Sequence, residues 1–179
     1  MRWGVWPTWV PVAIDQFSRA VVAVAPLEGP NAGWAVDVLE HAFRRHGPPK
    51  HLISDQEGVF TGEAFAELLS DWDVKHRLGA VGTHGSIAVT ERLIWTLKHE
   101  WLARVVLIRG LDHLREVLAD FQEYYNECRP HQRLGGARPA TLYRGQTWHM
   151  PDRSEKQLAG PLRLRHFREQ RITVYELAA

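Results

Sequence analysis

The sequence predicts an α/β fold in which a mixed sheet is flanked by helices. Short runs rich in β-branched residues alternate with segments whose apolar residues recur three and four positions apart. Their order is strand, strand, helix, strand, helix, strand, helix, helix, which is an α/β pattern of mixed type. With 179 residues, the chain can bury a core of its own without disulfides or metals.

Composition places the chain among ordinary globular proteins. Hydrophobic residues make up 45% and charged residues 24%, which excludes a disordered chain. No apolar run reaches the length of a membrane span and no signal peptide is evident, so we expect a soluble, intracellular protein. Cys128 is the only cysteine, which excludes an internal disulfide, and Cys128 with His131 is too small a set for structural zinc. The formal net charge of +1 does not by itself indicate nucleic-acid binding.

The first elements are two strands and a helix. Residues 10–14 and 20–25 are apolar and β-branched, and the polar residues 15–19 between them predict a tight turn. A Pro/Gly/Asn break follows. Residues 32–46 then place apolar side chains on one face and end at Gly47 and two prolines, which predicts a helix with a clear stop.

The middle of the chain continues the alternation. His51–Ser54 is a short buried strand in this interpretation, and a helix capped by Thr61 follows it. Residues 74–78 predict another strand, which leads into a glycine-rich and therefore mobile loop over residues 79–85. A longer helix is expected to begin near Ile87.

The last third is expected to hold one more helix and a loop-rich end. Apolar residues three and four apart predict an amphipathic helix over residues 111–126. Pro and Gly residues indicate a loop over residues 129–144, and residues 146–179 are either a small hairpin or a tail. We therefore expect a core domain over residues 1–145 and a C-terminal appendage over residues 146–179.

Two carboxylates stand where α/β folds place ligand sites. Asp55 directly follows the strand His51–Ser54, at its carboxyl end. Glu91 lies early in the helix that follows the glycine-rich loop. Spacing alone leaves open that Asp55 is a turn residue and Glu91 a solvated helix residue, because carboxylates at such separations are common.

Four sequence blocks give these two residues more weight. The blocks resemble segments of DDE transposases and retroviral-type integrases, and the 35 residues between Asp55 and Glu91 match the separation of the second and third metal-binding carboxylates in that family. The resemblance covers roughly residues 10–145. The blocks are IDQFSR at 14–19, SDQEGVFT at 54–61, HGSIAVTER at 84–92 with TLKHE at 96–100, and YNECRPH at 125–131.

The resemblance implies an RNase H-like fold and DNA strand transfer. It also implies two Mg²⁺ or Mn²⁺ ions held by a carboxylate triad, because in-line attack at phosphorus develops charge that hard cations can stabilise. Asp55 and Glu91 are then the catalytic and metal-binding residues. The implied partners are DNA, as transposon ends and target, and further copies of the chain in an active homo-oligomer, without a membrane. The implied location is the bacterial cytoplasm, associated with the nucleoid when DNA is bound.

Four basic residues are candidates for DNA contact. Lys98 lies seven residues beyond Glu91, so an α-helix would present both on one face. Similarity to integrases in which this helix meets DNA suggests that Lys98 contacts phosphate, with a solvated lysine as the alternative. His84 lies in the glycine-rich loop. Arg129 and His131 form a second possible phosphate contact, although such residues also cap helix ends.

The first carboxylate of the family triad has no evident counterpart. In the family it sits on the first core strand, which we expect to be missing or replaced here because residues 1–14 contain neither Asp nor Glu. Residues 2–6 could form a substitute strand, but Trp3, Trp6 and Trp9 around Pro7 more closely resemble the aromatic stretch found before the second strand in some relatives. Asp15 matches a turn residue outside the triad, so its expected role is hydrogen bonding within the turn.

Three functional interpretations stay open. The chain belongs to a DDE recombinase whose activity needs a segment absent from these 179 residues, or it is a truncated, inactive transposase fragment that still binds nucleic acid. The third interpretation is another RNase H-like nuclease, acting on RNA hybrids or branched DNA, and the block at 125–131 argues against it.

Overall fold

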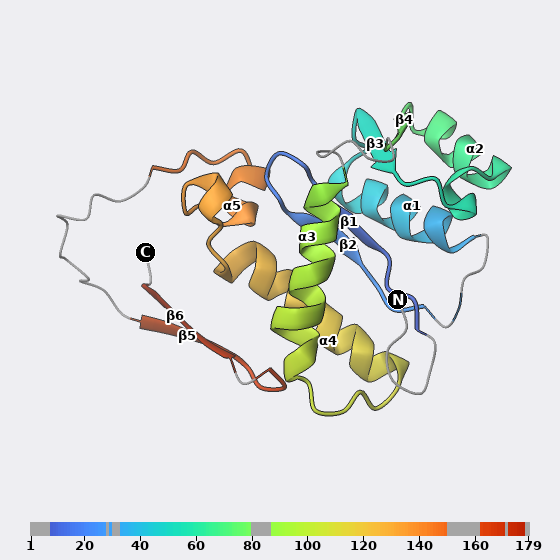
Figure 1. Cartoon of the computed structure of the whole chain (residues 1–179). Coiled ribbons are helices and arrows are strands. Elements are labelled where there is room, and N and C mark those ends of the chain that lie inside the picture. Colours follow the sequence, from blue (N-terminus) through green and yellow to red (C-terminus); the bar gives the residue numbers. More distant parts are fainter. Residues whose placement is uncertain are drawn as a thin grey trace. The chain divides into compact units, whose positions relative to one another are not determined.

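The computed structural model describes residues 8–27, 29, 33–79, 87–149, 162–170 and 172–177 (Figure 1). The chain divides into two compact units: Met1–Ile14 with Val21–Ile94, and Asp15–Ala20 with Trp95–Ala179. We call them unit 1 and unit 2. None of the helices in the described ranges combines the length and apolar character needed to cross a membrane.

Unit 1 begins with an antiparallel pair of strands. β1 (Val12–Ile14) pairs with β2 (Val21–Val24), and an irregularity in register falls between Ala13 and Ile14. The two strands expected over residues 10–14 and 20–25 are therefore confirmed, with shorter bounds. An isolated bridge between Trp9 and Leu27 extends the pairing beyond both strands.

The remainder of unit 1 alternates helices with parallel strands. α1 (Trp34–His46) ends at Gly47, whose φ of 81° suits glycine and whose N–H donates to the carbonyl of Phe43 at 2.8 Å. β3 (His51–Ser54) and β4 (Lys75–Leu78) pair in parallel, with α2 (Glu63–Asp71) between them in the chain (Figure 1). These elements confirm the predicted strands and helices, but β3 is not the expected buried strand, because His51 is exposed and the other three residues are partly exposed.

The prediction that Thr61 caps α2 is wrong. Gly62 occupies the N-cap position, and no side chain caps the helix there. The hydroxyl of Thr61 instead donates to the carbonyl of Gly58 at 3.1 Å, within a 3₁₀ turn (η1, Gly58–Phe60). Threonine hydroxyls readily bond to nearby backbone in turns, and here that local bond competes with capping.

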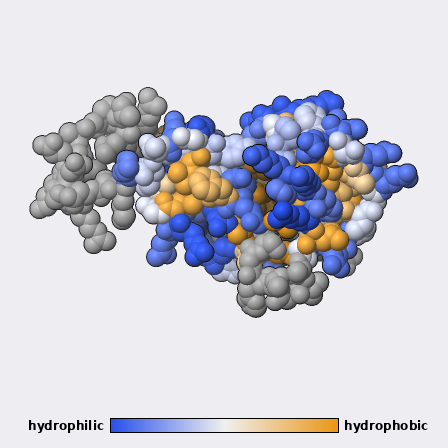
Figure 2. Space-filling view, turned by 90° about the horizontal axis from the view of Figure 1, so that it is seen from above, coloured by the Kyte–Doolittle hydropathy of each residue, from blue (hydrophilic) through white to orange (hydrophobic). Residues whose placement is uncertain are grey.

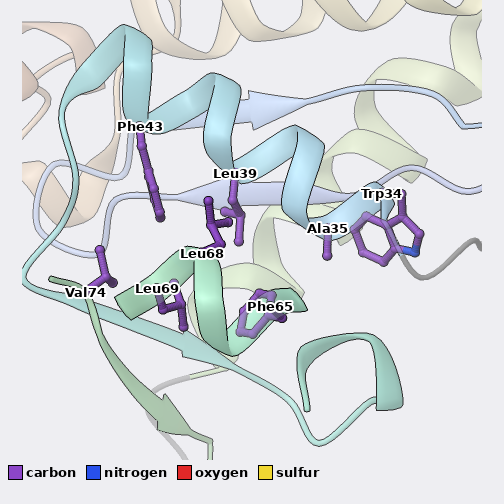
Figure 3. Close-up of a cluster of buried hydrophobic side chains, with 8 residues drawn as sticks. All are labelled: Trp34, Ala35, Leu39, Phe43, Phe65, Leu68, Leu69 and Val74. Atoms are coloured by element: carbon purple, nitrogen blue, oxygen red, sulfur yellow. The ribbon is translucent and has the colours of Figure 1, made fainter. Parts of the chain in front are cut away.

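The core of unit 1 lies between α1 and α2. Apolar side chains from the two helices point toward one another in Figure 3, and one further residue comes from the segment just before β4. Burying each large apolar side chain contributes roughly 1.5–3 kcal/mol, so this cluster accounts for why the two amphipathic patterns become helices that pack together. The cluster consists of Trp34, Ala35, Leu39, Phe43, Phe65, Leu68, Leu69 and Val74.

The strands of unit 1 belong to two separate sheets in the described part of the chain. One consists of β1 and β2, and the other of β3 and β4. The candidate substitute strand at residues 2–6 lies outside the described residues. The parallel pair therefore positions the candidate site, because Asp55 follows β3 at the end toward which both strands run.

Unit 2 is built on two helices that each end in a wide turn. α3 (Ala88–Thr96) begins in unit 1 and passes into a π-helical turn (η2, Leu97–Trp101), followed by a 3₁₀ turn (η3, Leu102–Arg104). α4 (Leu111–Glu123), the predicted amphipathic helix, passes likewise into a π-helical turn (η4, Tyr124–Cys128). The two wide turns meet, and the rings of Trp101 and Tyr124 stack with centroids 5.0 Å apart.

The segment after α4 is more regular than the sequence indicates. Residues 129–144 are predicted to form a loop, but they hold a 3₁₀ turn (η5, Gln132–Leu134) and a short helix, α5 (Pro139–Tyr143). Pro139 stands at the start of α5, where its missing N–H costs nothing and its fixed φ suits a helix. The loop prediction is therefore wrong for α5, because a proline that ends one helix can also begin another.

The C-terminal segment contains a hairpin. β5 (Leu162–Phe167) pairs antiparallel with β6 (Ile172–Leu177) (Figure 1). Phe167 is buried and meets the rings of Trp101 and Tyr124 edge-on at 5.4 and 5.7 Å. Arg165 donates to Glu123 of α4 at 2.9 Å, so the hairpin packs within unit 2. The division of the chain at residue 145 stays a prediction.

Hydrophobic side chains also reach the surface. Orange areas lie among the blue ones on the face shown in Figure 2. Several large apolar residues are strongly exposed in unit 2, including Phe17 in the turn after β1 and Val106 and Leu107 in the loop before α4.

Candidate functional site

Asp55 stands in an exposed turn at the carboxyl end of β3. One carboxylate oxygen, Oδ1, accepts a long hydrogen bond of 3.4 Å from the backbone N–H of Glu57, which is the bonding of a local Asp turn. The hydroxyl of Ser54 donates to the carbonyl of Asp55 at 2.8 Å. The carboxylate is exposed to solvent, with oxygen lone pairs left for a ligand.

Glu91 lies in the first turn of α3. Its backbone N–H donates to the carbonyl of Ile87 at 2.9 Å, and its side chain is exposed. The helix macrodipole favours a negative side chain at this end, so the position suits a carboxylate. Both predicted carboxylates are thus on unit 1, each at the beginning or end of an element.

Gly79 is the point where the two carboxylate-bearing segments meet. Its N–H donates to the carbonyl of Ser54, next to Asp55, at 2.7 Å. On its other side it lies against the side chain of Ile87, one helical turn before Glu91. The contact joins the end of β3 to the beginning of α3.

His76 is a neighbour of this site that sequence reasoning missed. Its Nε2 lies 2.9 Å from the hydroxyl of Ser54, and its ring meets Phe65 edge-on at 5.2 Å. Burial lowers the pKa of His76, which favours the neutral imidazole. Its position on β4, two residues beyond the buried Val74, is the one sequence signal for an inward-facing side chain.

The two carboxylates suit a hard divalent cation. Mg²⁺ prefers oxygen ligands and is commonly bound through one or two carboxylates, with waters and substrate phosphates completing its shell. Asp55 and Glu91 offer such oxygens. Among the described residues, no group of three or more His, Cys, Asp or Glu side chains is placed to hold a metal ion together.

Asp15 serves the turn that contains it. Its Oδ2 accepts hydrogen bonds from both the backbone N–H and the hydroxyl of Ser18, at 2.7 and 2.6 Å. Ser18 is fully buried, and its Oγ also lies 3.2 Å from the N–H of Ala20 and accepts from it. The expected role of Asp15 in hydrogen bonding within the turn is confirmed.

Arg129 is engaged within unit 2. Its guanidinium donates to Glu100 at 2.8 Å. The Arg129 side chain is about three-quarters buried and the Glu100 side chain about two-thirds buried. It also lies 5.8 Å from the ring centroid of Tyr125. Glu100 neutralises the charge that a DNA phosphate would use, so Arg129 is a weaker candidate for DNA contact than the sequence suggests.

His131 is an interior residue. It is 9% exposed, its backbone N–H donates to the carbonyl of Ala137 at 3.0 Å, and its ring packs on Tyr125 at 4.6 Å. Burial, reinforced by the charges of Arg129 and Arg19, lowers the pKa of His131 to about 4, against a backbone hydrogen bond to Tyr125 that raises it. A buried, neutral imidazole has little to offer a phosphate, so the DNA contact proposed for His131 does not suit its surroundings.

The lowered pKa of His131 predicts a pH-dependent stability. Between pH 6.5 and about 4 the unfolded chain binds a proton on His131 that the folded chain does not. The free energy of unfolding should therefore fall as the pH is lowered through this range, by about 3 kcal/mol for the full shift. Urea denaturation at pH 7, 5.5 and 4.5 should show a smaller fall for His131→Gln. The exposed His149→Gln should behave like the wild type, and equal pH dependence in all three proteins would contradict the prediction.

The remaining candidates for DNA contact are Lys98 and His84. Lys98 is half-buried and lies in the π-helical turn η2, where the i→i+5 spacing changes the angle between residues. The α-helical extrapolation from Glu91 therefore stops at Thr96. His84 lies outside the described residues, and so does the predicted mobile loop over residues 79–85 apart from Gly79.

Comparison with known proteins shows which family this is. Two family models, both described as integrase core domain, match residues 3–84 and 72–139. Together they span most of the chain, and the chain belongs to the integrase core domain family.

Relatives in sequence include insertion-element proteins. The putative transposase InsK for insertion sequence element IS150 of Escherichia coli K12 is 28% identical over 137 residues, which is 75% of this chain and 48% of that protein. An uncharacterized 39.2 kDa protein of insertion element IS476 from Xanthomonas euvesicatoria is 28% identical over 127 residues, covering 71% of this chain and 36% of that protein. The chain thus spans half or less of the length of these relatives.

Solved structures with the same fold include retroviral integrases. The HTLV-2 integrase catalytic core domain, solved in complex with magnesium, matches with a TM-score of 0.65 at 18% identity, over 80% of this chain and 89% of that one. The catalytic core of BIV integrase matches with a TM-score of 0.62 at 22% identity, over 78% and 88%. The fold is therefore RNase H-like, as the sequence resemblance implied.

Proposed function

We propose that this chain acts in DNA integration or transposition, by metal-dependent phosphodiester strand transfer, as part of a DDE transposase. The observation that carries the proposal is the meeting of the Asp55 and Glu91 segments at Gly79 in a chain of the integrase core family. The magnesium complex named for the HTLV-2 relative supports a divalent cation, Mg²⁺ or Mn²⁺, in the same role here.

The chemistry requires an oxygen nucleophile, a DNA phosphate and charge stabilisation. A new P–O bond forms as the bond from phosphorus to the 3′ oxygen breaks; the nucleophile loses a proton to solvent and the leaving oxygen gains one. A divalent cation, when bound, supplies Lewis-acid stabilisation of the developing charge. Asp55 and Glu91 would hold it, and their exposed carboxylates leave room for the phosphate on the solvent side.

The proposed partners are DNA and further copies of the chain. Insertion-sequence relatives support transposon ends and target DNA as substrates, and the dimeric and trimeric forms named for HTLV-2 integrase cores support assembly into an oligomer. Because the chain spans half or less of its curated relatives, we assign transposon-end recognition to parts of those longer proteins that this chain does not match.

A plasmid-nicking assay tests the proposal. The chain is incubated with supercoiled plasmid and Mn²⁺ or Mg²⁺, and the fraction of open-circular DNA is measured over time. We expect metal-dependent nicking that EDTA abolishes. DNA binding without any nicking, in a protein that folds normally, would contradict strand transfer by this chain.

A catalytically inactive fragment that retains nucleic-acid binding is the second candidate. One observation favours it: Asp15 is the only carboxylate in residues 8–27, and its Oδ2 is engaged in its turn by Ser18. The nicking assay separates the two functions when it is run beside an electrophoretic mobility-shift assay, which detects binding regardless of cleavage.

Lys98 provides a test of DNA binding that both candidates share. If its ammonium neutralises one phosphate, Lys98→Ala should weaken binding to duplex DNA and reduce the slope of log K against log salt by about 1. Fluorescence anisotropy between roughly 50 and 200 mM salt measures both quantities. The exposed Lys50→Ala, on unit 1, is the matched control. An unchanged slope would remove Lys98 from the interface.

A further inference from the structure

We propose that Gly79 is a positioning residue, whose missing side chain sets the separation between the Asp55 and Glu91 carboxylates. The inference rests on the proposed function for its consequence in catalysis, but its geometric claim stands by itself. It arises from three neighbours in unit 1: the carbonyl of Ser54, the side chain of Ile87, and Gly79 between them.

Lack of space, not backbone conformation, is the reason for a glycine at this position. The φ of Gly47 is 81°, in the region that favours glycine, whereas that of Gly79 lies outside it. A β-carbon built on Gly79 would lie 2.6 Å from Cδ1 and 2.8 Å from Cγ1 of Ile87, and 3.3 Å from the carbonyl oxygen of Ser54. Carbon atoms in contact are ordinarily about 3.5–4.0 Å apart.

Both neighbours are tied to a carboxylate. The N–H of Gly79 continues the parallel ladder of β3 and β4 by donating to Ser54, so Gly79 is fixed with respect to the residue before Asp55. Ile87 accepts the first backbone hydrogen bond of α3 from Glu91. An added methyl group would force the side-chain atoms Cδ1 and Cγ1 of Ile87 back by about 1 Å relative to ordinary contact.

That displacement would act on the site through α3. Ile87 is one turn before Glu91, so the part of the displacement that its side chain does not absorb moves the start of the helix. A misplacement of about 1 Å can cost roughly 100-fold in rate when two groups must converge. Gly58 offers a matched comparison. It lies three residues beyond Asp55, but a β-carbon on it would meet nothing within 4 Å.

The experiment uses a double-mutant cycle with two readouts. The variants are Gly79→Ala, Ile87→Ala, their combination, and Gly58→Ala as control. The first readout is the distance between spin labels on cysteines that replace the exposed Gln56 and Ala88, measured by pulsed electron paramagnetic resonance. The second is the rate of metal-dependent plasmid nicking. Cys128 is buried, and it is replaced by serine in every labelled protein.

We expect Gly79→Ala to lengthen or broaden the label distance and to slow nicking about 100-fold. The double variant should recover the wild-type distance and most of the rate, because Ile87→Ala removes both crowding atoms. Gly58→Ala should change neither. A general loss of stability would not be relieved by a second truncation in the core, since that normally destabilises further.

Two results would overturn the inference. One is an unchanged label distance in Gly79→Ala, and the other is failure of the double variant to recover the distance that Gly79→Ala alters. Failure of the proposed function is recognised separately, by wild-type protein that does not nick DNA. In that case the distance measurements still decide whether Gly79 sets the separation.

Discussion

Replacing Glu91 by Gln is expected to reduce metal-dependent nicking by about 100- to 1000-fold, the range found when one preorganised charge-stabilising group is removed from an active site. Gln keeps the size and helix propensity of Glu, so α3 should form as before. The charge changes, and an amide oxygen is a much weaker ligand for a hard divalent cation than a carboxylate. The initial nicking rates of the wild type and Glu91→Gln are compared at saturating Mn²⁺.

Glu63→Gln is the matched control for Glu91→Gln. Glu63 is also an exposed acid in the first turn of a helix in unit 1, but it belongs to α2. It should retain the wild-type rate. Equal nicking by wild type and Glu91→Gln would exclude Glu91 from catalysis and attribute any observed cleavage to another source.

The second large effect is expected for Trp101→Ala, which should lower the free energy of unfolding by about 3–5 kcal/mol. The Trp101 side chain is 1% exposed, and its indole N–H donates to the carbonyl of Val117 at 2.9 Å. Its ring contacts the rings of Phe121, Tyr124 and Phe167. Truncation leaves a cavity at the centre of unit 2 and removes a buried hydrogen bond.

Trp95→Ala is the control for that measurement. Trp95 lies on the same helical segment but is 46% exposed, so its loss should change the free energy of unfolding by less than about 1 kcal/mol. Urea denaturation followed by circular dichroism compares the two variants with the wild type. Similar losses for Trp95→Ala and Trp101→Ala would mean that unit 2 does not depend on the Trp101 cluster as described.

The elements that sequence predicts well are those specified by local pattern. α1 has one apolar face and a glycine stop at Gly47, and β3 has Leu52 and Ile53 at its centre, so their bounds could be predicted closely. Asp55 and Glu91 are recognisable because flanking motifs resemble a family, while the meeting of their segments at Gly79 depends on contacts between residues far apart in the chain. The close contact between Gly79 and Ile87 cannot be predicted from any local sequence pattern.

The candidate DNA contacts show the same limit. Arg129 pairs with Glu100, 29 residues earlier, and a sequence motif gives no sign of such a partner. His131 looks like part of a basic cluster in the sequence, but tertiary packing buries it and favours its neutral form. The number of basic residues in a sequence segment is therefore a poor predictor of the positive charge available at the surface of the folded protein.

The two π-helical turns, η2 and η4, constrain the number of residues that each turn itself can hold. Each carries one side of a paired contact: Trp101 stacks on Tyr124, and Glu100 bonds to Arg129. Removing one residue from either turn would convert it to α-helical spacing and rotate the residues beyond it by about 100°. Both pairings would then be lost together. Insertions and deletions should consequently be tolerated in the loop over residues 105–110 and excluded from η2 and η4.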